Sequence, residues 1–453
     1  MKDLTEGSIP RHIVAMAVPT AAGMLLQTLY YFVDLYFVAR LGDAALAGVS
    51  AAGNVMMFVF ALTQTLGVGT GALVSHAVGR KDQAGANLLF NQGVSLAGVM
   101  MLGTLVFGYA LAWPYMRAIG ADEATVEAGV TFLLWFIPGL ALQYPMVVMG
   151  AGLRATGIVK PTMVVQMVTV VLNAILAPIL IAGWGTGHPL GVAGAGLATS
   201  IATLAGNVVL ALYFVRLEKY VTFIAAQWKP RAQQWKELLK VGVPAGGEFA
   251  AMGLFTVTVY WITGGFGAAA QAGFGIGSRI MQMVFLPAMA VAFAAAPIAV
   301  QNFGARSFGR VRETFRAAVI GSCVLMAIIT LFCQVEGEAM ARIFSQDPAV
   351  VGVTIGFLHV ISLNFVAVGL IFTCSALFQA MGNTWPSLIS MGVRLVTFAV
   401  PAIYLSRHPG FQLHHLWYIS MVTVVLQAAL SYVLLRIEFR RKLAAPEARL
   451  APT

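Results

Sequence analysis

Long apolar runs dominate this sequence and restrict what it can fold into. Reading each run between charged residues, glycines and prolines predicts twelve spans, near 13–38, 44–78, 88–112, 129–153, 161–183, 190–215, 238–263, 270–302, 314–335, 350–380, 386–406 and 413–436. About 20 apolar residues are enough for a helix to cross a bilayer. Only 10% of the residues are charged, against about a quarter in soluble proteins. The sequence therefore predicts an all-α membrane protein with twelve transmembrane helices.

The distribution of lysine and arginine predicts the orientation in the membrane. Most of the 27 basic residues lie in segments on one side, above all the hydrophilic stretch 216–241 and the C-terminal tail. Because basic loops stay in the cytoplasm, we expect a multi-pass protein of a bacterial inner (plasma) membrane with both termini cytoplasmic. This asymmetry also accounts for the net charge of +10, so we expect the lipid bilayer and no nucleic acid as a partner.

The first half of the chain aligns with the second half. Pro19 and Pro244 lie 225 residues apart, and the same shift aligns Gly48 with Gly273, Gly79 with Gly304, Gly157 with Gly382 and Pro161 with Pro386. Matches at one shift predict a duplicated six-helix unit, that is, two parallel repeats. We predict an N-terminal six-helix bundle over 1–215, a cytoplasmic linker over 216–237 and a C-terminal bundle with a basic tail over 238–453.

Only two of the 17 acidic residues, Asp34 and Glu248, fall inside the predicted spans. A carboxylate in the hydrocarbon region costs roughly 2.5–3.5 kcal/mol, so Asp34 is either functional or hydrated at the interface. Asn173 and Thr199 lie roughly 15 Å from the outer ends of their spans, and these depths allow a cluster with Asp34. Such oxygen ligands suit a hard cation, although Asn and Thr also serve as hydrogen-bonding residues between helices. Pro19 interrupts the first span and is either a moving hinge or a static kink.

The second acid has an arginine at a matching depth in the predicted spans. Glu248 and Arg394 each lie eight residues beyond the expected cytoplasmic entry of a span, at Lys240 and Pro386, which puts both about 12 Å deep. An acid partner lowers the cost of a buried arginine. We therefore predict a charge pair in the C-terminal half. In the alternative, Arg394 extends to the headgroups and Glu248 faces the cavity alone, where it suits the positive charge of a drug.

Several motifs occur in an order that resembles the multidrug and toxic compound extrusion (MATE) family of the multidrug/oligosaccharidyl-lipid/polysaccharide flippase superfamily. They are LQTLYYFVDLYFVARLG in the first span, LRATG and KP after the fourth, LNAILAPILI, GVAGAGLATS and QNFGAR. The resemblance covers the whole chain. It implies two pseudo-symmetric six-helix bundles that form a V around a central cavity. It also implies a transporter that exports cationic, amphipathic compounds in exchange for H⁺ or Na⁺.

The resemblance also implies roles for particular residues. Asp34 matches an acid tied to binding of the coupling ion, and Asn173 and Thr199 match polar positions beside it, where Na⁺ is one implied ligand. Glu248 matches an acid on the seventh helix. Ala177 stands where the family commonly has a second Asn or an Asp, and apolar residues surround Ala367, where one branch has an Asp. Both H⁺ and Na⁺ therefore remain open as the coupling ion.

Taken together, the patterns favour a secondary active antiporter that exports organic cations, with Asp34 as its coupling-ion site. One alternative is a lipid-linked saccharide flippase of the same superfamily, although only Arg279 and Arg394 supply positive charge within the spans away from their ends. The other is a non-transporting membrane receptor or channel. The sequence has neither a phosphate-binding loop nor an HExxH motif, so we expect no enzyme and no cofactor. We expect a monomer.

Overall fold

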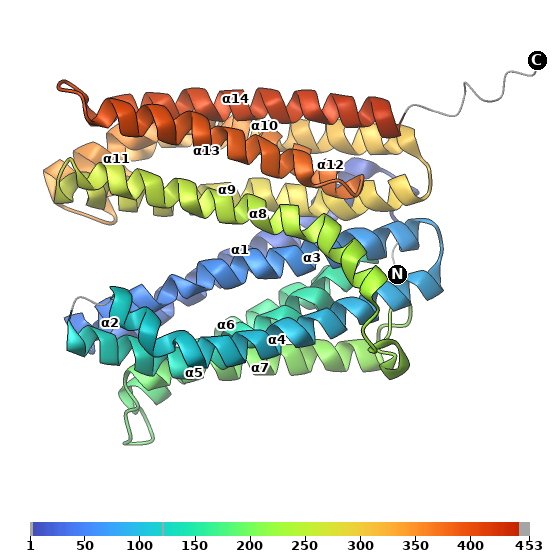
Figure 1. The fold of residues 1–453 in the computed structure, drawn as a ribbon, viewed down its shortest axis with the longest axis horizontal. Helices are drawn as coiled ribbons and strands as arrows, with labels where there is room; N and C mark the ends of the chain where they lie inside the picture. The colour runs from blue at the N-terminus through green and yellow to red at the C-terminus, as the bar shows by residue number, and fades with distance from the viewer. Residues whose placement is uncertain (1–2, 120–121, 444–453) are drawn as a thin grey trace, which may run out of the picture. The chain divides into compact units, whose positions relative to one another are not determined.

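The computed structural model describes residues 3–119 and 122–443, without the side chains of 27–35, 39, 43 and 268. Every regular element in this part of the chain is a helix (Figure 1). In chain order these are α1 (Ile9–Ala39), α2 (Asp43–Gly53), α3 (Val55–Gly79), α4 (Gln83–Ile119), α5 (Glu123–Ala155), α6 (Lys160–Ala182), α7 (Val192–Arg216), η1 (Ala225–Gln227), α8 (Ala232–Gly264), α9 (Ala268–Gly304), α10 (Phe308–Arg342), α11 (Pro348–Ile361), η2 (Ser362–Asn364), α12 (Phe365–Ala380), α13 (Trp385–Ser406) and α14 (Leu413–Lys442). The predicted all-α class is confirmed.

Twelve stretches of the described chain are long and apolar enough to cross a membrane, as predicted. Two of them consist of more than one helix. The second, Ala44–Gly79, is divided between α2 and α3 at Asn54, although the sequence predicted one continuous run. Gly53 and Asn54 are both weak helix formers, which is consistent with a break at this point. The tenth, Pro348–Ala380, joins α11 and α12 through the short helix η2.

The described chain packs into two compact units. Unit 1 comprises residues 3 and 22–246, and unit 2 comprises residues 4–21 and 247–443. These boundaries differ from the predicted ones, because the linker and the start of α8 pack within unit 1, whereas the start of α1 packs within unit 2. The chain changes unit after Ala21 and again after Gly246, two positions that lie 225 residues apart.

The backbone repeats itself at the same shift, which confirms the predicted duplication. Three pairs of residues share a left-handed φ: Gly42 (109°) and Gly267 (97°), Lys81 (59°) and Arg306 (58°), and Gly157 (77°) and Gly382 (66°). A left-handed φ is uncommon outside glycine. Its recurrence at Lys81 and Arg306 shows that the turns after helices α3 and α9 have the same backbone conformation.

The linker lies along α4 because asparagine and glutamine side chains of α4 bind its backbone. Asn91 Oδ1 accepts hydrogen bonds from the backbone N–H of Ile224 and from Trp228 Nε1, both at 2.9 Å, and Asn91 Nδ2 donates to Thr222 O at 2.9 Å. Gln92 Nε2 donates to Lys229 O at 2.8 Å. Buried backbone groups need such partners, so these side chains hold the linker in unit 1.

The N-terminal segment is held in unit 2 in a comparable way. The backbone N–H of Leu4 donates to Gln301 Oε1 at 3.2 Å, and Asn302 Nδ2 donates to Leu4 O at 3.0 Å. Arg310 Nη2 donates to Gly7 O at 3.0 Å. These residues belong to the end of α9 and the start of α10, so the segment that precedes α1 is fixed to the second repeat.

Candidate functional site

Two of the predicted site residues lie on α1. Asp34 is within this helix, but its side chain is outside the described residues. Pro19 is also inside α1, where Thr20 Oγ1 donates to Met16 O at 2.7 Å. The chain passes from unit 2 to unit 1 just after Pro19, between Ala21 and Ala22. The hinge at Pro19 therefore stays a prediction, now placed next to this change of unit.

Asn173 on α6 and Thr199 on α7 lie at the same level of one helix interface. A Cβ atom added to Gly194 would lie 2.4 Å from Leu180 O, and one added to Gly206 would lie 2.7 Å from Thr169 Oγ1. These two close contacts show that α6 and α7 run antiparallel and bracket both residues. Asn173 is therefore opposite residues 201–202, which places Thr199 within about 5 Å of its level.

Asn173 is fully buried, and neither its Oδ1 nor its Nδ2 has a hydrogen-bond partner in the described part of the chain. Native structures satisfy nearly all buried polar groups, and an unsatisfied one costs about 1–3 kcal/mol. Thr199 is also buried, and its Oγ1 donates to Ala195 O at 3.2 Å. Among the described residues, the Asn173 amide therefore has both its oxygen lone pairs and its N–H groups without a partner.

Glu248 on α8 belongs to a polar cluster in unit 2. Ser375 Oγ, from α12, donates to Glu248 Oε2 at 2.8 Å. The same hydroxyl lies 3.0 Å from Ser387 Oγ on α13. Two serines from two different helices therefore surround one carboxylate, and none of these three side chains supplies a positive charge.

The predicted ion pair between Glu248 and Arg394 is not formed. Arg394 Cζ lies 4.2 Å from the centre of the Phe255 ring, and Arg394 Nη1 donates to Gln427 Oε1 at 3.4 Å. Arg394 Nε is buried without a hydrogen-bond partner among the described residues. The guanidinium is thus stabilised by an aromatic face and one long hydrogen bond, while the carboxylate binds serine.

The register of α8 and α13 explains why the prediction was wrong. Glu248 is linked through Ser375 to Ser387, and Phe255 contacts Arg394, so the two helices run parallel. Seven residues separate Ser387 from Arg394, which puts the guanidinium about 10 Å further along the bundle than the carboxylate. Equal depth was inferred from Lys240 and Pro386, but α8 begins at Ala232, well before Lys240.

We expect the substitutions Glu248→Gln and Arg394→Gln to have additive effects on stability. Residues about 10 Å apart without a shared partner usually show coupling below about 0.5 kcal/mol. A double-mutant cycle of thermal or denaturant unfolding on the purified protein measures this coupling. Recovery of most of the loss in the double variant would show that the two charges interact after all.

The two repeats differ at their acidic positions. The counterpart of Asp34 is Val259, which is buried in the apolar core of unit 2. The counterpart of Glu248 is Gly23, where an added Cβ would lie 1.9 Å from Gln166 Oε1. The space that a side chain would fill in the first repeat is therefore taken by a glutamine from α6. The two repeats therefore share a backbone fold but place their acidic side chains at different positions.

The sequence analysis did not identify Ser375, Ser387 or Gln427 as site residues. All three lie in apolar helices, where small polar residues are common at helix interfaces, and they carry no motif. Gln427 is buried and lies 3.6 Å from Met391 Sδ as well as binding Arg394. The sequence did contain one indication of such a residue, because Gln427 places a polar amide in the apolar run of α14.

A family model described as MatE matches residues 19–179 and 244–405, two stretches that correspond to the two repeats. The "Multidrug export protein MepA" of Staphylococcus saprophyticus is 26% identical over 385 residues, which cover 83% of each chain. The protein of the same name from Staphylococcus aureus strain N315 is 25% identical over 394 residues, covering 86% of this chain and 85% of its own.

Solved structures share the fold along almost the whole chain. One, described as the "Outward-facing conformation of a multidrug resistance MATE family transporter of the MOP superfamily", has a TM-score of 0.91 at 22% identity and covers 98% of both chains. Another is a MOP superfamily transporter from Pyrococcus furiosus, with a TM-score of 0.91, 23% identity and coverage of 97% of this chain and 98% of its own.

Proposed function

Because the chain belongs to the MatE family of multidrug and toxic compound extrusion transporters, we propose that it is a secondary active antiporter. It exports organic cations in exchange for H⁺ or Na⁺, with the coupling ion bound at Asp34, Asn173 and Thr199. It acts as a monomer in a bacterial inner membrane with both termini in the cytoplasm. The export of drugs by relatives named for multidrug export supports the substrate class.

The Asn173 amide, which has no hydrogen-bond partner among the described residues, is the observation that best supports this ion site. It is fully buried and lies level with Thr199 in the α6–α7 interface. A buried amide without partners lowers stability by about 1–3 kcal/mol, a cost that a ligand bound during part of the transport cycle would offset. Amide and hydroxyl oxygens suit Na⁺, and the same groups hydrogen-bond a carboxyl group that takes up H⁺.

Glu248 has a different role in this proposal, because it has no arginine partner among the described residues. Its carboxylate binds only serine among the contacts described, so it is suited to the positive charge of the exported compound. The ion and the drug must prefer different conformations of the transporter, since otherwise the ion gradient drives nothing. Separate acids in the two repeats allow the ion and the drug to act on this equilibrium without direct competition for one carboxylate.

Efflux of ethidium from proteoliposomes, with either a pH gradient or a Na⁺ gradient imposed alone, tests the proposed function. We expect one of the two gradients to drive transport against the ethidium gradient, and collapse of that gradient by an ionophore to stop it. A protein that moves ethidium equally without any ion gradient would be a channel or a uniporter, and the proposal would be wrong.

We expect Asn173→Leu to increase stability while it weakens coupling. Leucine has a similar volume and removes the unsatisfied amide, so the unfolding free energy should rise by about 1 kcal/mol. The matched control is Asn91→Leu, at an equally buried asparagine of the same unit whose amide holds the linker; that variant should lose several kcal/mol. Thermal unfolding and gradient-driven efflux measure both effects. Equal destabilisation of the two variants would mean that Asn173 has native partners.

A further inference from the structure

The cytoplasmic ends of α10 and α14, as the proposed topology places them, meet through aromatic side chains. The Phe315 ring lies 6.4 Å from the Tyr432 ring and 5.7 Å from the Phe439 ring, measured between ring centres. Arg312 Nη2 donates to Leu443 O at 3.1 Å. The start of α10 and the end of α14 are therefore in contact within unit 2.

Four arginines lie on the two helices that meet at Phe315. Helix residues three or four apart share a face, so Arg312 lies beside Phe315, and Arg436 lies beside Tyr432 and Phe439. By the same rule Arg316 shares a face with Arg312, and Arg440 shares a face with Arg436. All four arginines are exposed. We call Arg312, Arg316, Arg436 and Arg440 the arginine patch. Arg436 also lies 5.9 Å from the Tyr432 ring, a pairing typical of the membrane interface.

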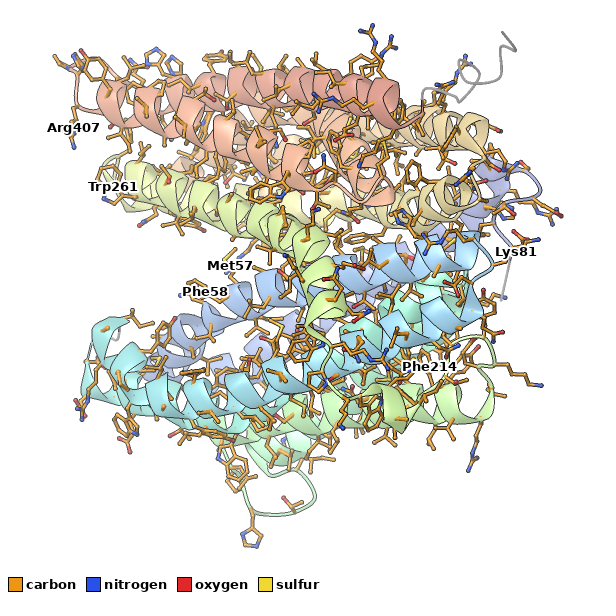
Figure 2. The ribbon with its side chains drawn as sticks, turned by 45° about the vertical axis from the view of Figure 1, so that its right-hand side comes forward. Met57, Phe58, Lys81, Phe214, Trp261 and Arg407 are labelled. Atoms are coloured by element: carbon orange, nitrogen blue, oxygen red, sulfur yellow. The ribbon has the colours of Figure 1, made fainter. Side chains whose placement is uncertain are left out.

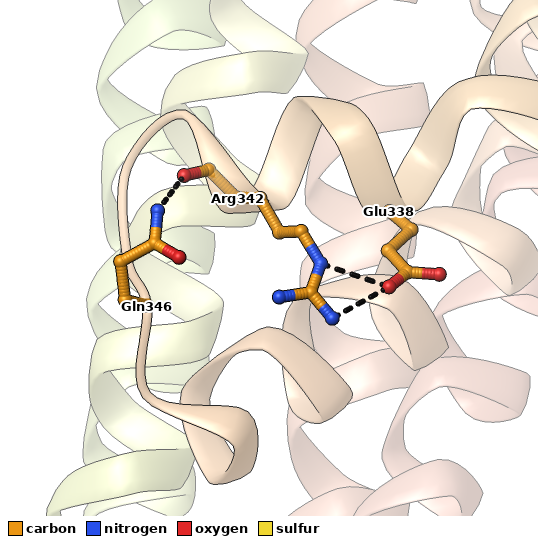
Figure 3. Close-up of polar contacts among 3 residues, drawn as sticks. All are labelled: Glu338, Arg342 and Gln346. Atoms are coloured by element: carbon orange, nitrogen blue, oxygen red, sulfur yellow. Dashed lines mark hydrogen bonds and ion pairs between the residues drawn. The ribbon is translucent and has the colours of Figure 1, made fainter.

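No acidic side chain neutralises the arginine patch in the described part of the chain. The two ion pairs found there are Arg342–Glu338 at 2.7 Å, at the other end of α10 (Figure 3), and Lys442–Glu438 at 3.9 Å. Glu438 is buried and also binds Asn383. Glu313 is exposed and close in sequence to Arg316, but it forms no ion pair with any described residue. The patch therefore has a net positive charge available to a ligand.

Exposed apolar side chains continue from the arginine patch along both helices. On α10 they are Ile320, Val324 and Ile328, each four residues beyond the last and all more than half exposed. On α14 they are Val433, Leu426 and Val422. A surface with cationic groups at one end and an apolar stripe beyond it matches the shape of a phospholipid. A soluble phosphate would use only the arginines.

We propose that the arginine patch binds the phosphate of an anionic membrane phospholipid whose acyl chains lie along the apolar side chains of α10 and α14. The guanidinium group suits this role because it forms paired hydrogen bonds to phosphate oxygens. The general excess of basic residues on the cytoplasmic side would be met by lysines and arginines anywhere in the loops. Here the charge is gathered on two helices distant in sequence, around one aromatic contact. The inference rests on the proposed topology but not on the coupling ion.

Native mass spectrometry of the purified full-length protein with added phosphatidylglycerol or phosphatidylcholine tests this inference. The variant Arg316→Gln/Arg436→Gln removes one arginine from each helix and leaves the hydrogen bond of Arg312 in place. We expect the wild type to retain phosphatidylglycerol over phosphatidylcholine, and the double variant to bind phosphatidylglycerol about tenfold more weakly.

The matched control is Lys81→Gln/Arg216→Gln, which removes the same charge from exposed positions of unit 1; Lys81 projects from the end of that unit (Figure 2). This control should retain phosphatidylglycerol as the wild type does. An equal loss in both double variants would show a non-specific effect of charge and would overturn the proposal. Displacement of the lipid by millimolar inorganic phosphate would likewise overturn it in favour of a soluble phosphate site.

Discussion

We expect Asp34→Asn to abolish ethidium efflux driven by an ion gradient, while the variant still folds and inserts into the membrane. Asparagine keeps the size of the side chain but neither takes up a proton nor carries a charge for Na⁺. A carboxylate in the hydrocarbon region is unfavourable by roughly 2.5–3.5 kcal/mol, so its removal does not harm the fold. We expect the efflux rate in proteoliposomes to fall to that of protein-free vesicles.

Glu127→Gln is the control for this experiment, because it makes the same change from carboxylate to amide at an exposed residue of α5. It should leave efflux unchanged. If the Asp34→Asn protein pumps ethidium at the wild-type rate, Asp34 is not the coupling-ion site.

We expect Gly242→Ala to destabilise the protein strongly. A Cβ atom at Gly242 would lie only 2.0 Å from the backbone oxygen of Thr65 on α3, and one at Gly246 would lie 2.5 Å from Ala61 O. Glycines four residues apart allow two membrane helices to approach this closely. A backbone oxygen cannot rotate away as a flexible side chain does, so the helices must separate. We expect a loss of about 3 kcal/mol and a lower melting temperature.

Gly103→Ala is the matched control, since it makes the same substitution inside α4, where no heavy atom lies within 4 Å of an added Cβ. Alanine favours the helix over glycine, so this variant should be unchanged or more stable by up to about 1 kcal/mol. Equal melting temperatures for the two variants would contradict the close packing of α3 against α8 inferred from Gly242.

The positions of the helices and the repeat were predictable because they depend on local composition. Apolar length predicted the spans, and the shared shift of Pro19 and Pro244 predicted a duplication that the backbone angles of Lys81 and Arg306 repeat. The break at Asn54 was not predicted. The two weak helix formers Gly53 and Asn54 hardly change the apolar composition from which the spans were predicted.

Contacts between helices were not predictable at the level of single residues. Arg394 was paired with Glu248 by counting from helix entrances, but α8 extends further toward its N-terminus than α13 does, and the register moves Arg394 to Phe255. Similarly, the sequence does not distinguish Asn91 from Asn173, because both are asparagines within apolar spans. Asn91 binds groups of the linker more than a hundred residues away, so only the structure distinguishes it from Asn173.

The central proposal is that Asp34 in the first repeat binds the coupling ion and Glu248 in the second repeat binds the drug. It is tested most directly by binding of the coupling ion to purified protein. Isothermal calorimetry with Na⁺, together with measurement of protons released on addition of ethidium, compares the wild type with Asp34→Asn and Glu248→Gln. We expect Asp34→Asn to lose ion binding and Glu248→Gln to keep it while binding ethidium more weakly. Equal loss of ion binding in both variants would contradict an ion site confined to the first repeat.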